Sequence, residues 1–421
     1  MIELCPSDRR QWMRRCAAST LGVSFAGGLA FGRDDPSATA GPQSVIYLFM
    51  EGAMSHLDSF DPKTAVDAAG PTRSIATAVP GVHFGHRFER MATIADQFAI
   101  VRSLSTETGD HDQGQYWMRT GYKPLASIAH PAMGGWMLHT KGKRNPHLPG
   151  NYLIGRSGRH PGAGFLPPSI SPVPIAKPQS GLANADLPRY VSPRLLDRRL
   201  SLAEQLDRSF QSAHSLPAID AYNQLYRQAR MLIGSEHLAA FDLDREPSPI
   251  RQQYGETKIG RGCLLARRLV QSGARFVDVA MGGWDMHQDL DAAMTTQAGE
   301  LDRAVAALMA DLNRTGLIEQ TLVVLTTEFG RKPTINANAG RDHHPGAFSS
   351  LLAGAGIQTG GVLGSTDRIG HAVEDYPVSV ADFNRTIAAA AGLPIDDEFS
   401  APNGRPFRIG GDGDPIDDLL A

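Results

Sequence analysis

Carboxylates and imidazoles follow two apolar runs in the second half of the chain. Residues 275–280 lead into Gly-Gly-Trp-Asp-Met-His at 282–287, and residues 321–327 lead into Glu-Phe-Gly-Arg at 328–331. In an open parallel sheet, ligands bind just beyond the carboxyl ends of the strands, so these side chains are predicted to line one site. The candidate metal ligands in this half of the chain are Asp285, His287, Glu328, Asp342, His343 and His344.

Glu51 joins this set because it directly follows another apolar run, at residues 44–50. Imidazole nitrogens mixed with carboxylate oxygens suit zinc, manganese or another divalent ion, whereas an oxygen-only cage favours calcium or magnesium. We therefore expect one or two divalent ions, with Zn, Mn and Ca as candidates. Two ions about 4 Å apart can clamp the attacking and leaving oxygens of a displacement at phosphorus or sulfur. Arg331 and Arg341 would then bind the remaining anionic oxygens of the substrate.

The alternative without a functional site is that each of these residues is structural or solvated, which is the more common role of a single surface His or Asp. Only their shared placement after parallel strands favours a joint site. The segment between the two apolar runs supports that placement, because it carries the apolar stripe of a helix that ends at Gly316. Strand, helix and strand of this length form a right-handed crossover, which opens both charged loops on one edge of the sheet.

Other elements are predicted along the chain. A strand is expected at 97–101 and a helix from near His111 to Gly121, with Asp110 and Asp112 either as helix caps or as functional residues. Residues 139–193 are rich in Gly, Pro and Ser and are predicted to form a lid or rim over the site. Three helices are predicted between 194 and 272, the second at about 222–233, and a last helix begins at Ser379.

The whole pattern predicts an α/β fold in a single domain over residues 41–421, with a loop-rich and helical insertion at about 139–272. The composition, with 42% hydrophobic and 20% charged residues, is that of a soluble globular protein. A net charge of -3 gives no reason to expect nucleic acid as a partner. Beyond residue 40, Cys263 is the only cysteine, and its apolar helical surroundings favour a buried inert thiol.

The first forty residues are predicted to be a twin-arginine export signal. Arg9 and Arg10 precede a modestly apolar stretch at 17–31, and Ala-Thr-Ala at 38–40 offers a cleavage site before Gly41. We therefore expect a periplasmic or otherwise extracytoplasmic protein without a stable membrane span, since the apolar stretch is too short for one. The alternative is a basic amphipathic start to a cytosolic chain.

A family resemblance covers nearly all of the chain after residue 40. The motifs at 52–63, 283–287, 328–331, 340–343 and 364–367 resemble those of the bacterial family called "domain of unknown function 1501". That family is similar in turn to the alkaline-phosphatase-like superfamily of sulfatases, phosphatases and phosphoglycerate mutases. The resemblance implies an alkaline-phosphatase-like fold, in which a mostly parallel central sheet has helices on both faces, and a metal-bearing site.

Residue by residue, the resemblance implies that Glu51 is the first acidic ligand and that Asp285 and His287 are the pair before the long helix. The late histidine ligand falls on His343 or His344. The superfamily's Asp-His dipeptide falls on Glu328 and Phe329, so one histidine is replaced.

The superfamily's serine or threonine nucleophile falls on or beside His111. His111 is thus the candidate catalytic residue, as nucleophile, metal ligand or general base, with Thr106 and Thr108 as alternative nucleophiles. The chain also lacks a Cys-x-Pro-x-Arg sulfatase signature.

These features predict an exported metal-dependent hydrolase of a phosphate or sulfate ester, with a sulfated or phosphorylated glycan among the possible substrates. A noncatalytic carbohydrate-binding or surface module that keeps the fold is the alternative, favoured by the replaced histidine and the absent serine.

Overall fold

The computed structural model describes residues 42–64, 66–155, 160–182, 185, 190–213, 232–233 and 235–421. The predicted export signal and nearly all of the predicted helix at about 222–233 lie outside the described residues. No helix among the described residues is long and apolar enough to cross a membrane.

A nine-stranded sheet forms the centre of the described chain. Every neighbouring pair in it is parallel except the two pairs made by β11, which is antiparallel to both of its neighbours. The order across the sheet is β12 (Val362–Leu363), β4 (Ala99–Ser105), β11 (Phe348–Gly354), β8 (Thr321–Thr326), β1 (Ser44–Met50), β7 (Phe276–Met281), β5 (Asn151–Ile154) and β6 (Val173–Ile175), with β15 (Val378–Ser379) also pairing with β4.

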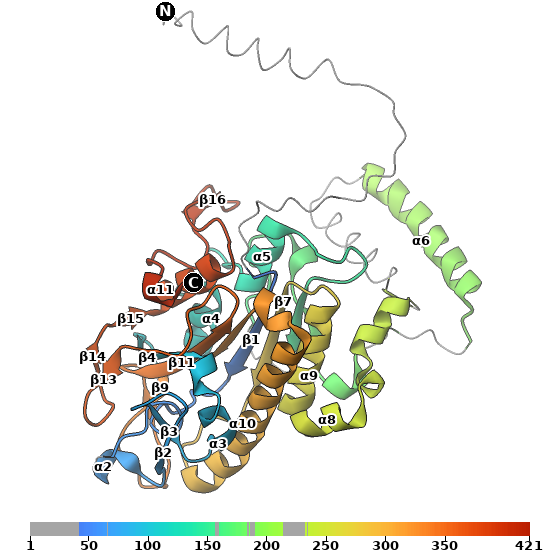
Figure 1. Ribbon diagram of the computed structural model, residues 1–421. Coiled ribbons are helices and arrows are strands. Elements are labelled where there is room, and N and C mark those ends of the chain that lie inside the picture. Colours follow the sequence, from blue (N-terminus) through green and yellow to red (C-terminus); the bar gives the residue numbers. More distant parts are fainter. Residues whose placement is uncertain are drawn as a thin grey trace, which may run out of the picture. The chain divides into compact units, whose positions relative to one another are not determined.

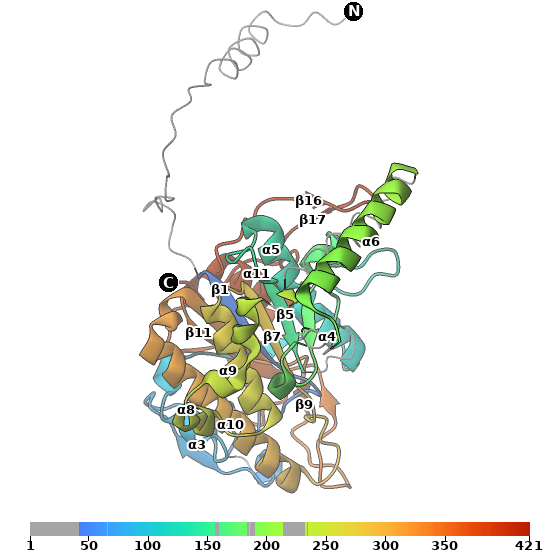
Figure 2. The ribbon, with the colours of Figure 1, turned by 90° about the vertical axis from the view of Figure 1, so that its right-hand side faces the viewer.

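The central strand β1 is buried on both faces, as its continuous apolar sequence predicts. Ile46 and Leu48 belong to a core that includes α9 (Lys258–Gln271) and α10 (Leu290–Thr315). Val45 and Tyr47 belong to a second core that includes α5 (Met133–Lys141) and α11 (Val380–Ala390). Helices therefore cover both faces of a mostly parallel sheet, and Figures 1 and 2 show α9 and α10 on one side of β1 and α11 on the other.

The carboxyl ends of three strands coincide at one edge. Met50 lies opposite Met281 of β7, and Phe49 lies opposite Thr326 of β8. The charged loops after these strands therefore open side by side, which confirms the arrangement expected from the two apolar runs.

The helix ends follow local sequence signals. α10 ends at Gly316, which adopts a left-handed conformation with φ of 71°, and Ser379 and Asp382 form a capping box at the start of α11. α4 (His111–Thr120) begins at Asp110, whose carboxylate accepts a hydrogen bond from the Gln113 amide at 2.9 Å. Of the two roles left open for Asp110, the structure thus gives it that of a helix cap.

The segment at about 139–272, predicted to be an insertion, also supplies parts of the central sheet and of its helical cover. It contributes β5 and β6 to one edge of the sheet and α9 to its cover, besides α6 (Pro193–Ala213) and α8 (Ser248–Tyr254). The two strands have only four and three residues and are separated by Gly- and Pro-rich loops, so no sustained pattern revealed them.

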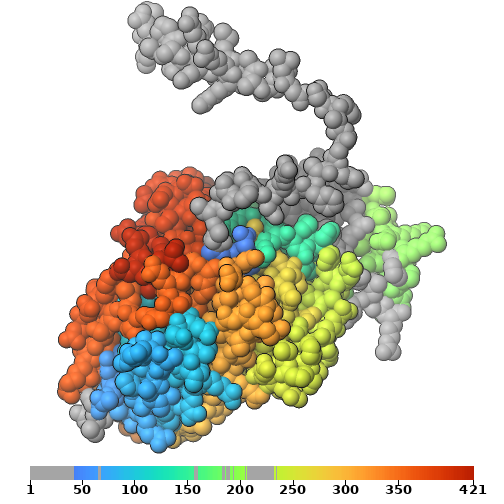
Figure 3. All heavy atoms as spheres, in the orientation of Figure 1, coloured from blue at the N-terminus to red at the C-terminus, as the bar shows by residue number. Residues whose placement is uncertain are grey.

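Short elements complete the chain. A small helix, α3 (Glu89–Ala92), packs on α10, where Asp302 accepts a hydrogen bond from the Met91 amide at 2.8 Å. Figure 3 shows this part of the chain, in blue to cyan, beside α10, in orange. Other short elements are α2 (Val66–Ala69) and the two-stranded pairs β2–β3 (Ser74–Ala76, His83–Gly85), β9–β10 (Gly330–Arg331, His343–His344), β13–β14 (Ser365–Thr366, Val373–Asp375) and β16–β17 (Phe399–Ser400, Pro406–Phe407), besides several short 3-10 helices.

Candidate metal centre

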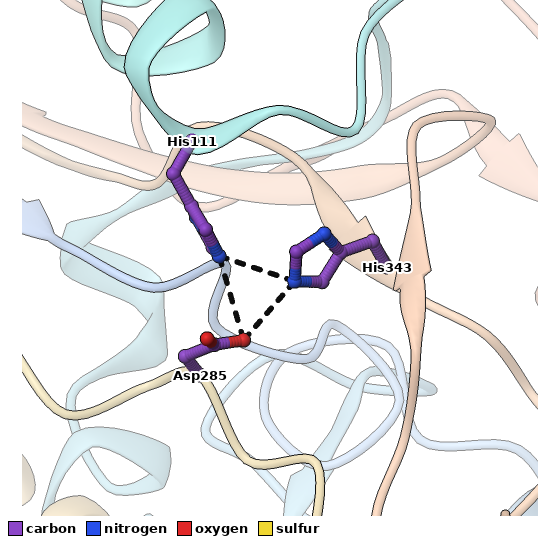
Figure 4. A group of neighbouring side chains, drawn as sticks. All are labelled: His111, Asp285 and His343. Atoms are coloured by element: carbon purple, nitrogen blue, oxygen red, sulfur yellow. Dashed lines mark hydrogen bonds and ion pairs between the residues drawn. The ribbon is translucent and has the colours of Figure 1, made fainter.

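Three side chains from distant parts of the sequence converge beyond the carboxyl edge of the sheet: His111, Asp285 and His343 (Figure 4). The Nε2 atoms of the two histidines are 3.1 Å apart, and Oδ1 of Asp285 lies 3.4 Å from Nε2 of His111 and 3.1 Å from Nε2 of His343. The donor atoms of all three side chains lie within 4.8 Å of one another, a spacing at which they could hold a metal ion.

A fourth predicted ligand adjoins this group. Nε2 of His287 lies 2.9 Å from Nε2 of His343 and 3.0 Å from Oδ1 of Asp285. Asp285 and His287 lie in the loop between β7 and α10, His111 is the first residue of α4, and His343 lies in β10. Four of the residues singled out in the sequence are thus brought together.

The hydrogen bonds at the far side of each ring fix its tautomer. Nδ1 of His343 lies 2.7 Å from the carbonyl oxygen of Gly109, which can only accept, so Nδ1 carries the proton. Arg331 donates from Nη1 to Nε2 of His287 at 3.3 Å, which makes that nitrogen an acceptor. Nδ1 of His287 then donates to Oδ1 of Asp342 at 3.3 Å, and Asn336 holds that carboxylate oxygen with a hydrogen bond of 3.0 Å.

Glu328 orients the third ring. Its Oε1 lies 2.8 Å from Nδ1 of His111 and also accepts from the Gly52 amide at 2.8 Å, in a fully buried position. The hydrogen bond to Glu328 outweighs burial and raises the pKa of His111. Burial would raise the pKa of Glu328, but the hydrogen bonds from His111 and Gly52 hold it low. Glu328 was predicted to be a metal ligand. Instead, it contacts the candidate ligand His111 from the side away from the centre, where the N–H groups of His111 and Gly52 bind its carboxylate.

The centre consequently presents acceptors to one another. With their Nδ1 atoms engaged as donors, His111 and His343 turn Nε2 lone pairs toward each other and toward the Asp285 carboxylate, and a cation would remove the repulsion. Ligands at 2.0–2.1 Å from a tetrahedral zinc ion are about 3.3 Å apart. The three separations within the group, 3.1, 3.1 and 3.4 Å, are close to that spacing, so these residues fit a divalent metal ion.

Arg331 supports the centre and offers nothing to a substrate. Its Nε, Nη1 and Nη2 groups donate to the carbonyl oxygens of Ala53, Arg341 and Gly52, and further bonds reach His287 and Asp285. All five N–H groups are thus engaged. Burial would raise the pKa of Asp285, but the hydrogen bonds and charge of Arg331 hold it well below its usual range.

Arg341, the other arginine expected to bind substrate, is not at the centre. Its guanidinium is fully buried, with Nε donating to Oδ2 of Asp58 at 2.7 Å and Nη2 to the carbonyl oxygen of Ala68 at 2.8 Å. The remaining N–H groups bond to Oδ1 of Asp58 and to the carbonyl oxygens of Lys332 and Pro333. A buried carboxylate with an otherwise uncompensated charge accounts for this placement.

Two more predicted ligands also lie apart from the group. Consecutive residues of a strand point to opposite sides, so His344 points away from the side chain of His343. Its Nε2 contacts the carbonyl oxygen of His371, and the two imidazole rings stack. Glu51 accepts a hydrogen bond of 3.3 Å from Arg119, whose Nε donates to Asp278 at 3.0 Å. The structure therefore does not bring Glu51 or His344 into the histidine cluster.

The sequence carried signals for the residues that were missed. Arg119 follows His111 by eight residues on the predicted helix, a spacing that places both on one face. Asp278 lies inside an otherwise apolar strand, where an acidic residue needs a partner. Nothing in the sequence indicated that the Gly109 carbonyl would contact His343, because the position of a backbone atom depends on the fold.

Comparison with known proteins gives one family. The family model described as "Protein of unknown function (DUF1501)" matches residues 42–420. No curated protein matches the chain. Among solved structures, Ps i-CgsB is similar with a TM-score of 0.41 and 14% identity, over 84% of this chain and 73% of that one.

Two further structures are similar at comparable levels. The PsFucS1 sulfatase from Pseudoalteromonas sp. has a TM-score of 0.39 and 12% identity, over 85% of this chain and 69% of that one. The alkaline phosphatase from the Antarctic bacterium TAB5 has a TM-score of 0.36 and 11% identity, over 77% of this chain and 94% of that one.

Proposed function

The chain belongs to the DUF1501 family, and we propose that it is a metal-dependent hydrolase that acts on a phosphate or sulfate ester. The observation that carries this proposal is the convergence of His111, Asp285 and His343, with His287 beside them. A bound divalent ion would supply a Lewis acid for the ester oxygen and lower the pKa of an attacking water molecule. Zinc or manganese fits the mixed nitrogen and oxygen donors best.

The chain's own residues prepare this centre. Glu328 and Gly109 keep the Nε2 lone pairs of His111 and His343 directed inward. Arg331 holds the Asp285 carboxylate in its charged form. The residues are therefore set before any ligand arrives, which lowers the cost of binding.

Direct attack by water is favoured over a covalent enzyme intermediate. The first position of α4 carries His111 rather than a hydroxyl residue. The hydroxyl oxygens of Thr106 and Thr108 accept hydrogen bonds from the amides of Thr108 and Asp110, at 3.5 and 3.1 Å, within their own loop. Neither hydroxyl contacts a base in the described chain, as an activated nucleophile would.

We propose that a cavity of about 540 Å³ at the same edge of the sheet receives the alcohol part of the ester. It lies at the carboxyl edge of β5 and β7, with Ile154, Val279 and Met281 among its apolar walls and Lys258 and Glu300 among its charged groups. Gly282 also lines it and is three residues from Asp285, a span of at most about 11 Å. The proposed leaving group is thus an alcohol with an apolar face.

Metal analysis and an ester panel test the proposed function together. We expect elemental analysis to find a divalent ion in the purified protein, or after reconstitution with Zn²⁺ or Mn²⁺, and none in His343→Ala. His371→Ala is the matched control, since His371 is outside the cluster. Aryl phosphates, phosphodiesters and aryl sulfates should be hydrolysed only by the metal-loaded forms. A metal-loaded, folded protein that turns over none of them would contradict the proposal.

A noncatalytic carbohydrate-binding or surface module is the second candidate. It is favoured by the engagement of every N–H group of Arg331 and Arg341 with the protein itself, which leaves neither arginine for an anionic substrate. Binding of sulfated glycans with unchanged substrate after long incubation would support this candidate over hydrolysis.

Export by the twin-arginine route is a separate part of the proposal. It is supported by the paired arginines at 9 and 10 and the small residues before Gly41. We expect the extracytoplasmic protein to begin near Gly41, and an intact Met1 on that protein in N-terminal sequencing would contradict cleavage there.

A further inference from the structure

A buried ion-pair network lies next to the metal centre. Nε of Arg119 donates to Oδ2 of Asp278 at 3.0 Å, and Nη2 donates to Oε1 of Glu51 at 3.3 Å. His160 approaches the same oxygen of Asp278 at 3.4 Å, and the guanidinium lies 3.9 Å from the centre of the Phe49 ring. The Arg119 and Asp278 side chains are each only 2% exposed, so the charges must compensate one another.

The network touches the centre through the backbone. The carbonyl oxygen of Glu51 accepts from the Trp284 amide at 3.2 Å, directly before Asp285. The next amide, that of Gly52, donates to Glu328 behind His111. His111 and Arg119 also share α4, so one helix supplies both a ligand of the centre and the cation beside it.

We propose that the centre holds one divalent ion, and that the guanidinium of Arg119 provides the positive charge which a second ion would otherwise bring to Glu51. This inference rests on the proposed function for the ion itself. A guanidinium keeps its charge at every accessible pH and presents a fork that matches two carboxylates. A second divalent ion at Glu51 would lie against that fixed charge and be repelled by it.

The ligands for a second ion are also turned away. His111 directs its Nδ1 proton, not a lone pair, toward Glu328. Oε1 of Glu328 already accepts from two N–H groups. The facing atoms of Glu328 and His111 are thus engaged with each other, so neither residue can bind a second ion without losing these contacts.

Counting the bound ions separates one from two. The experiment compares three proteins: the wild type, Glu51→Gln and His343→Ala. Each is saturated with Zn²⁺ and freed of excess ion, and the zinc per folded chain is then measured. Calorimetric titration gives the dissociation constant. We expect one ion in the wild type and one in Glu51→Gln, with affinity changed by less than about tenfold, the smallest loss typical of an outer-shell residue. His343→Ala should hold none.

Two ions in the wild type, falling to one in Glu51→Gln, would overturn the inference while leaving the proposed hydrolase intact. No ion in the wild type would overturn the proposed function and this inference with it. These failures are distinguishable, because they differ in the count of the unmutated protein.

Removing the guanidinium tests its role directly. Arg119→Met keeps an unbranched stem but leaves Glu51 and Asp278 without their cation, so the folded variant should take up a second, weaker ion. Arg119→Lys, which retains the charge, is the matched control and should stay at one. A folded Arg119→Met that still binds one ion would contradict the assignment to Arg119. If this variant does not fold, the Glu51→Gln count decides.

Discussion

At the scale of single residues, the centre depends on side chains that do not face the ion position. Glu328 is the clearest case, because it is fully buried and its carboxylate fixes the tautomer of His111. Such outer-shell partners typically account for about 10–100-fold in metal affinity. The ligands alone therefore understate what the sequence must specify.

Glu328→Gln should weaken metal binding by about 10–100-fold, since the amide no longer selects one protonated nitrogen on His111. Competition with a fluorescent zinc chelator measures the change. Glu107→Gln is the control, because Glu107 is an exposed carboxylate paired with Lys123. Equal affinities for both variants would refute the role given to Glu328.

His56 makes the stability of the protein depend on pH. Burial lowers the pKa of His56 from 6.5 to about 4, and its Nε2 lies 2.8 Å from the carbonyl oxygen of Gly370. The unfolded chain therefore binds the proton first, so stability is highest above pH 6.5 and is lost as the pH falls toward 4, by about 3 kcal/mol. Urea unfolding at pH 7 and pH 4.5 measures this loss.

His56→Gln, which retains an N–H donor for Gly370, should flatten the pH dependence in that window. His83→Gln, at an exposed position, should leave it unchanged. An unaltered pH profile in His56→Gln would rule out His56 as the titrating group.

At the scale of elements, α4 joins local helix stability to the centre, since its first residue, His111, is a proposed metal ligand. Asp110→Ala removes the cap and should cost about 1 kcal/mol, as should Ser379→Ala at the start of α11. Only Asp110→Ala should also weaken metal binding, because only α4 positions His111. Denaturant unfolding and zinc titration of both variants test this, and equal metal affinities would show that the cap does not position His111.

The elements that the sequence predicted were those with a long or continuous pattern. The all-apolar β1 and the striped α10 had such patterns, and the shared carboxyl edge followed from their order. β5 and β6 were missed because three or four residues carry no period.

The same limit applies to the centre. Residue types and placement indicated Asp285, His287 and His343, and the family resemblance indicated His111, but neither indicated which way a side chain turns from a loop. Glu51, Glu328 and Arg341 follow the right motifs and turn to Arg119, His111 and Asp58, because buried charges take the partners that packing supplies.

At the scale of the whole molecule, ion binding should be coupled to folding stability. The ligands come from three separate segments, so an unfolded chain cannot bind the ion in the same way. An ion at about 100 times its dissociation constant adds about 2.7 kcal/mol. We expect zinc to raise the melting temperature and a chelator to lower it again, with no shift in His343→Ala; an equal shift in that variant would place the ion elsewhere.

The wide spacing of the ligands along the chain has a consequence for the order of biosynthesis. His111 and Asp285 are 174 positions apart, and His343 follows 58 later, so the three side chains cannot meet until the ribosome has passed residue 343. The proposed ion would then be acquired after translation of that last segment, from the pool that surrounds the chain as it folds. Because sites of this kind rank metals by availability as much as by affinity, the compartment of folding selects the metal. If the twin-arginine route carries the chain already folded, that choice is made in the cytoplasm, before export.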